Sequence, residues 1–147
     1  MAEAEYEDFV AEVETLLRHV SASVRKRGRS ILVNFDVTPV QFDALTNIDR
    51  AGDLTIGDLS ARLGLAYSTT TDLVDRMEQR GYVQRVRDAA DKRVVRVRAL
   101  ASGRAVIEEV MAARRAYLST VLDRVADADR QTLLSILQLL DRRLRGV

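Results

Sequence analysis

Apolar residues recur at three- and four-residue spacing near the start of the chain, which is the pattern of an amphipathic helix. They are Tyr6, Phe9, Val10, Val13, Leu16, Leu17, Val20 and Val24. The spacing predicts a helix over residues 6–27, and Gly28 with the segment RSILVNFD ends it. Thr38 then caps a second helix, which has Pro39 at its first position, where a missing N–H costs nothing, and which stops near Gly52.

The next two predicted helices form one unit. Thr55 opens a short helix, with Asp58 three residues later as in a capping box, and Gly64 ends it. A fourth helix follows at once, over residues 67–80. Two short helices joined by a tight turn that contains glycine make a helix-turn-helix.

Two segments after Gly81, YVQRVRD and RVVRVRA, alternate apolar and polar residues, which predicts a β-hairpin with one buried face. We expect Val95 and Val97 to face the core and Arg96 and Arg98 to point outward. The loop between the strands lacks a tight Asn-Gly turn, so its tip should be mobile. A hairpin directly after a helix-turn-helix is a wing, so the expected fold is mainly α with a small β-hairpin wing.

Helical spacing returns from about Ala101, and Asp127 is the expected cap of the last helix. That helix carries Leu133, Leu134, Ile136, Leu137, Leu139, Leu140 and Leu144, so it is apolar around more than one face. A small monomer would struggle to cover such a helix, which favours a partner subunit. The alternative is that one face packs on the domain and the other on the first helix.

Charge is unevenly distributed, although the net charge is only +1. Residues 80–98 contain seven basic residues against two acidic ones, Asp88 and Asp91. A local basic patch is what binding to phosphates requires, while a solvated charged face would give the same pattern.

Little in the composition suits catalysis or metal binding. There is no cysteine, which excludes a disulfide framework, a thiolate zinc site and a thiol switch. His19 is the only histidine, no glycine-rich phosphate loop is present, and the hydroxyl run at residues 68–71 has no base beside it. We therefore expect no enzyme, no metal and no cofactor. Length predicts a single domain over residues 1–147. Without a secretory signal or an apolar run of about 18 residues, we expect a cytoplasmic location and no membrane contact.

With the wing placed, the chain resembles the MarR family of bacterial transcriptional regulators over nearly its whole length. The most specific segment is LTIGDLSARLGLAYSTTTDLVDRMEQRGYVQRVRDAADKR, in which Asp91 and Arg93 fit the family's Asp-x-Arg wing motif. The resemblance implies a homodimer that binds double-stranded DNA through two winged helix-turn-helix lobes, with the first and last helices interlocked across the two-fold axis. Residues 38–99 would then be the DNA-binding lobe, and residues 1–30 and 101–147 the dimerisation region.

The chain departs from the family pattern at three places. Ala89 stands where proline is usual, residues 99–100 read Ala-Leu where Leu-Thr is common, and Asp72 stands where a basic or neutral residue is frequent. For this reason we do not expect the chain to read the same operator as a relative.

The recognition helix and the wing supply the candidate DNA contacts. The N-terminal residues of the helix should approach base edges, whereas Thr70 should point inward. Asp72 either accepts a hydrogen bond from a cytosine amino group or pairs with Arg76 on the same face. Arg85 and Arg87 would hold phosphates, and Arg93 would enter the minor groove, held in place by Asp91 as the resemblance implies. The full candidate set is Tyr67, Ser68, Thr69, Thr71, Arg76, Arg85, Arg87, Asp91 and Arg93.

Regulation is inferred from the resemblance alone. It implies a repressor of a pseudo-palindromic operator, released when a small aromatic or anionic effector binds between the dimer helices and the DNA lobe. His19, Phe35 and Phe42 are candidates to line that pocket, although ordinary core or surface positions explain each of them. The alternative function is a helical protein-interaction module whose basic hairpin contacts an acidic partner.

Overall fold

The computed structural model describes residues 2–146. The predicted helices and the hairpin follow in the expected order, and η1 and β1 are additional elements that were not predicted. They are α1 (Glu3–Arg29), the 3-10 helix η1 (Leu32–Phe35), α2 (Pro39–Ala51), β1 (Asp53–Thr55), α3 (Ile56–Leu63), α4 (Tyr67–Gln79), β2 (Val83–Arg87), β3 (Val95–Ala99), α5 (Ala101–Leu122) and α6 (Asp127–Arg145). The predicted fold class, mainly α with a small hairpin wing, is confirmed.

Local signals set the helix boundaries in the middle of the chain. Thr38 accepts a hydrogen bond from the Gln41 backbone N–H at 3.2 Å, and the Gln41 side chain accepts one from the Thr38 N–H at 2.9 Å, a complete capping box. The Thr55 hydroxyl accepts from the Asp58 N–H at 3.1 Å. Gly64 follows α3 with a φ of 65°, a left-handed conformation that glycine adopts without strain.

The cap of the last helix differs from the prediction. Ala126 is the N-cap of α6, without a side-chain hydrogen bond, and Asp127 is the first helical residue. A carboxylate in the first turn still interacts favourably with the helix dipole. Leu100 likewise caps α5 without a side-chain bond, as the missing threonine suggests.

The sheet has one strand more than the hairpin. Its order is β1-β3-β2, all antiparallel, and Val97 of β3 lies opposite Leu54 of β1 and Arg85 of β2. Val97 is fully buried, but Val95 is 37% exposed, so the prediction that both valines face the core is wrong for Val95. Val95 lies at the wing end of β3, where it lines an open groove together with Arg93 and Val94.

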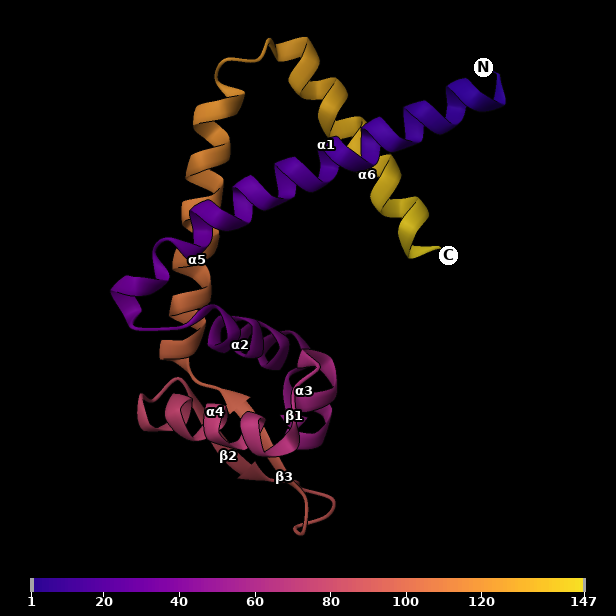
Figure 1. The fold of residues 1–147 in the computed structure, drawn as a ribbon. Helices are drawn as coiled ribbons and strands as arrows, with labels where there is room; N and C mark the ends of the chain where they lie inside the picture. The colour runs from indigo at the N-terminus through magenta and orange to yellow at the C-terminus, as the bar shows by residue number, and fades with distance from the viewer. Residues whose placement is uncertain (1, 147) are drawn as a thin grey trace.

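The core lies within the lobe that α2, α3, α4 and the sheet form around one end of α5 (Figure 1). Its fully buried side chains include Leu45, Ile48, Leu59, Val74, Met77, Val97 and Val106. Gly103 allows α5 to approach this lobe closely, because a Cβ at that position would collide with the Tyr82 carbonyl oxygen and lie 2.9 Å from Leu45 Cδ1.

Helix α1 packs against α5 with its C-terminal end and extends away from the lobe, and α6 follows the far end of α5 (Figure 1). No residue of α6 is buried, and Gly28 is the only buried residue of α1 within the described chain. The alternative in which the last helix covers both its faces within one chain is therefore not what the structure shows. None of the helices in residues 2–146 combines the length and apolar character that crossing a membrane requires.

Candidate nucleic-acid interface

Helix α4 has one face in the core and one in solvent. Thr70, Val74 and Met77 are its buried residues, and the Thr70 hydroxyl donates to the Ala66 carbonyl at 3.0 Å, so Thr70 points inward as predicted. With 100° of rotation per residue, Ser68 and Asp72 lie on the opposite face, and both are exposed. The outward face of the first two turns is thus polar and accessible.

A groove of about 480 Å³ runs between the start of α3, the start of α4 and the wing. Four of the predicted site residues line it together: Tyr67 and Thr71 from α4, Arg85 from β2 and Arg93 from the wing loop. Ser68, Thr69 and Arg76 are exposed on α4 outside this groove. The fold therefore brings the recognition helix and the wing to one surface.

Arg85 is bound to α4 by two carboxylates. Its guanidinium donates to Asp75 and to Glu78, each at 2.6 Å. Burial acts to lower the pKa of Arg85, but the bonds to Glu78 and Asp75 outweigh it and raise the pKa. The side chain predicted to hold a phosphate thus also joins β2 to the recognition helix, and its charge is balanced within the chain.

The wing tip presents Arg93 on a carboxylate support. Arg93 Nε and Nη2 donate to Asp91 Oδ1 and Oδ2, each at 3.0 Å, and the Arg93 backbone N–H donates to Asp91 Oδ1 at 3.0 Å. The bond from Arg93 lowers the pKa of Asp91. The Arg93 side chain is nevertheless 90% exposed, so the pairing orients it without burying it.

Asp88 organises the loop between the strands, a role that was not predicted. Its carboxylate accepts from the Ala90 and Asp91 backbone N–H groups at 2.8 and 3.1 Å and from Arg96 Nε at 2.5 Å. These bonds, that of Arg96 first, lower the pKa of Asp88 to about 2. The signal in the sequence was an aspartate at the start of a turn, where its side chain can bond the backbone two residues on.

Arg87 has a similar structural contact, since its guanidinium donates to the Lys92 carbonyl at 2.9 Å across the wing loop. Arg98 donates to both Asp53 oxygens at 2.9 and 2.8 Å and so joins β3 to β1. The outward arginines of the wing are therefore largely engaged in contacts within the chain.

Asp72 and Arg76 do not form the pair that their spacing allows. Within residues 2–146 no ion pair or hydrogen bond joins them, although both are exposed on α4. Within the described residues the Asp72 carboxylate therefore has no ion-pair partner, whereas the carboxylate of Asp75 is bound to Arg85.

The three candidate effector residues do not come together. His19 is exposed on α1, Phe35 is half-buried, and Phe42 lies in the core beneath the Arg114 guanidinium, 5.8 Å from the ring centre. No cluster of three or more histidine, aspartate or glutamate side chains suited to a metal ion occurs in the described part of the chain.

Two adjoining hollows lie instead between the end of α1 and the middle of α5, with volumes of about 270 and 340 Å³. Both are lined by Arg27, Ser30 and Tyr117, and Lys26 borders the first. This lining combines positive charge, a hydroxyl group and an aromatic ring.

Residues 35–94 match the model of the MarR family. The chain is 43% identical over 122 residues to the uncharacterised HTH-type transcriptional regulator YsmB of Bacillus subtilis, covering 83% of this chain and 84% of that protein.

Solved structures give the same result. A MarR family protein from Bacillus stearothermophilus is 46% identical, with a TM-score of 0.78 over 95% of this chain and 97% of that one. The transcriptional regulator Tm0710 from Thermotoga maritima is 33% identical, with a TM-score of 0.87 over 92% and 96% of the two chains.

Proposed function

Because the chain belongs to the MarR family and is a DNA-binding transcriptional regulator rather than an enzyme, we propose that it acts as a homodimeric repressor. Each subunit places α4 in the major groove and its wing tip in the adjacent minor groove of a pseudo-palindromic operator. Residues 38–99 form the DNA-binding lobe, and residues 1–30 and 101–147, of which 1 and 147 lie outside the described residues, form the dimer. The half-sites lie about one helical turn, roughly 34 Å, apart.

The observation that carries the proposal is the shared surface of the recognition helix and the wing. The Asp91-held Arg93 side chain lines the same groove as Tyr67 and Thr71. An arginine held in a fixed orientation and still exposed suits a narrow minor groove, where the negative potential is strongest.

The helix face beside this groove supplies the remaining contacts. Ser68 and Thr69 offer hydroxyl groups to base edges, and Arg76 lies two turns farther along α4, where it can reach a phosphate. Arg85 and Arg87 border the duplex from the wing, although their intrachain contacts reduce the charge that they can offer.

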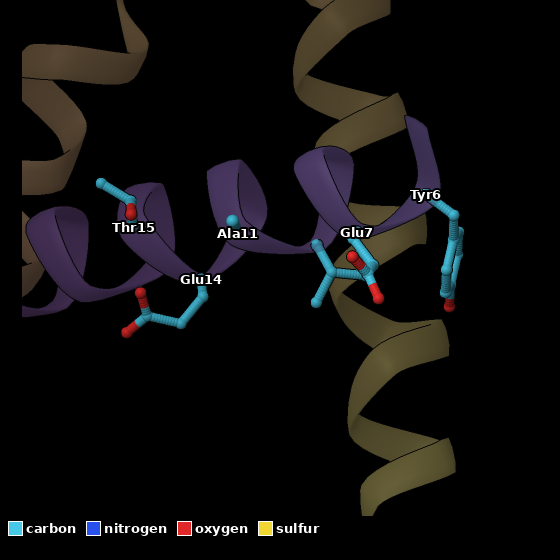
Figure 2. A pocket seen from close by; sticks show the side chains of 6 residues that line it. Tyr6, Glu7, Ala11, Glu14 and Thr15 are labelled. Carbon is cyan, nitrogen blue, oxygen red and sulfur yellow. The ribbon is translucent and has the colours of Figure 1, made fainter. Parts of the chain in front are cut away.

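Dimerisation is supported by the uncovered apolar faces of α1 and α6. On α1, Tyr6, Phe9, Val10, Leu16, Leu17 and Val20 are each about half exposed, and Leu133, Leu134, Ile136, Leu137, Leu139, Leu140 and Leu144 are exposed on α6. A hollow of about 520 Å³ also runs along α1, and Figure 2 shows Tyr6, Glu7 and Glu14 projecting from the helix around it. Soluble monomers rarely expose so large a contiguous apolar surface, so a second copy of the chain is the expected cover.

Arg93→Ala tests the wing contact by measured DNA affinity. The variant should lose about 1–3 kcal/mol of binding free energy for each wing, and the salt slope of the dimer should be shallower by about 2, because one arginine is lost from each subunit. The wild-type slope of log K against log salt should be about −7 if the dimer covers about eight phosphates. Arg124→Ala is the matched control, because Arg124 is exposed beyond α5 and far along the chain from the groove. Equal affinities for wild type and Arg93→Ala would remove Arg93 from the site.

The hollows between α1 and α5 are where we place the effector. A small aromatic anion could pair with Arg27 and stack on Tyr117 at the junction between the dimer helices and α5. Titration with benzoate as a probe should release DNA from the wild type and not from Arg27→Ala. Release that is equally sensitive in both proteins would place the effector elsewhere.

A further inference from the structure

We propose that Asp72 selects the base at one position of each half-site, by accepting a hydrogen bond from the exocyclic amino group of cytosine. The proposal rests on the proposed function, because it takes α4 as the helix that enters the major groove. It adds a specificity-determining residue to that function, and it makes the preferred base at one position of each half-site depend on a single side chain.

The position of Asp72 is that of a base-reading residue. It lies one turn after Ser68, about half a turn around the helix from the buried Thr70, and it is exposed. In a helix-turn-helix the N-terminal part of the recognition helix contacts base edges. Asp72 therefore faces the DNA and not the core or the wing.

Its carboxylate forms no ion pair within residues 2–146, in contrast to four other aspartates near this surface. Four acidic side chains near this surface are bound to arginines, in the pairs Asp53–Arg98, Asp75–Arg85, Asp88–Arg96 and Asp91–Arg93. Asp72 has no such partner within residues 2–146, and Arg76 four residues later does not supply one. On the outward face of α4, Asp72 thus keeps its full capacity to accept hydrogen bonds.

The chemistry of base edges determines which partner this carboxylate tolerates. An ionised aspartate only accepts hydrogen bonds. In the major groove guanine presents two acceptors and thymine presents one acceptor, so both would repel it. Adenine presents a donor beside an acceptor, whereas cytosine presents only its amino donor. A carboxylate that loses hydration near phosphates without gaining a donor is costly, so cytosine is strongly favoured over the other bases.

Selection from a random DNA pool, followed by sequencing, tests the proposal. The wild type should enrich cytosine at one position in each half-site, and replacing that base should weaken binding about tenfold. Asp72→Asn should shift the preference at this position to adenine, since an amide can donate and accept as the adenine edge requires. Asp72→Ala should lose the preference there and keep the other positions of the site.

Asp75→Asn is the matched control. It removes the same charge from the same helix, but from a carboxylate that is bound to Arg85. It should leave the cytosine preference intact, even if overall affinity changes. Because Asp72 is exposed, thermal unfolding of its variants should match the wild type.

Two results distinguish the possible failures. If Asp72→Asn and Asp72→Ala raise the affinity for all sequences alike and leave the base frequencies unchanged, Asp72 is only a repelling charge and the proposal is wrong. If the wild type enriches no DNA sequence at all, the proposed function fails, and the role of Asp72 fails with it.

Discussion

Replacing Leu137 with aspartate should separate the subunits of the proposed dimer. Leu137 lies in the middle of the stripe that Leu133, Leu140 and Leu144 form along α6, and it is 45% exposed in the single chain. Full burial of a leucine side chain stabilises by about 1.5–3 kcal/mol, so covering the exposed half contributes about 1 kcal/mol per subunit. Aspartate loses that contribution and adds the cost of desolvating a carboxylate, which we set at only about 1 kcal/mol as a lower bound.

Two-fold symmetry doubles each effect. The variant dimer should therefore be weaker by at least about 4 kcal/mol, which corresponds to a dissociation constant about a thousandfold higher. Sedimentation velocity over a range of protein concentrations measures that constant directly. Since α6 contributes no buried residue to the lobe, circular dichroism should show the helices of the monomer still formed.

Ser135→Asp is the control for Leu137→Asp. Ser135 is exposed on the face of α6 opposite Leu137, so the substitution introduces the same charge two residues away. It should remain a dimer. DNA binding gives a second readout, because a monomer meets about half of the phosphates and its salt slope should fall to about half of the wild-type value. A Leu137→Asp protein that dimerises like the wild type, or a Ser135→Asp protein that dissociates as readily, would refute α6 as the interface.

Three further predictions concern the lobe and the wing. Gly103→Ala should lower the free energy of unfolding by about 1–3 kcal/mol in chemical denaturation, although replacing a helical glycine with alanine usually raises it. Gly57→Ala is the control and should not destabilise, because no atom lies nearer than 3.9 Å to the added Cβ. Equal effects of the two substitutions would contradict the close packing of α5. Thr55→Ala should cost about 1 kcal/mol by the same measurement, because it removes the cap of α3, and an unchanged midpoint would show that the cap is not needed. Because the pKa of Asp88 is lowered, the stabilisation from its bond to Arg96 is fully present above the ordinary carboxyl pKa of 3.8 and is lost as the pH falls through about 2. An NMR titration of the Asp88 carboxyl group with a midpoint near 3.8 would exclude that bond in solution.

The sequence predicted those features of the fold that depend on contacts between residues a few positions apart. The caps at Thr38 and Thr55 and the helix stop at Gly64 were all predicted and are confirmed. Capping bonds span three residues, and a glycine stop needs only its own backbone freedom. The order of helices and the winged helix-turn-helix followed from these signals together with the apolar spacing.

Prediction was weakest for contacts between distant segments. Strand β1 is three residues long, too short to show an alternating pattern, and its pairing with β3 joins residues 45 positions apart, such as Asp53 and Arg98. Conversely, Asp72 and Arg76 have the spacing of a helical ion pair and do not form one. Such a pair stabilises a helix by only about 0.2–0.5 kcal/mol, so spacing alone cannot establish it.

The relatives decide between the two functions that the sequence left open. A basic hairpin by itself suits an acidic protein partner as well as DNA. The similarity to transcriptional regulators over more than four fifths of the chain favours DNA, and the protein-interaction module has no comparable support.

By itself the sequence determined the order of the helices and the caps of α2 and α3, that a wing follows the helix-turn-helix, and which residues carry the hydroxyl and basic groups of the surface. Those properties depend on local hydrogen bonds and on the period of apolar residues. The tertiary structure decided which charges remain available, because Arg85 and Arg98 find their carboxylates only when α4, β1 and the wing come together, while Asp72 finds none. Ion pairing in a folded chain depends on distance in space, and residue order alone does not contain that distance.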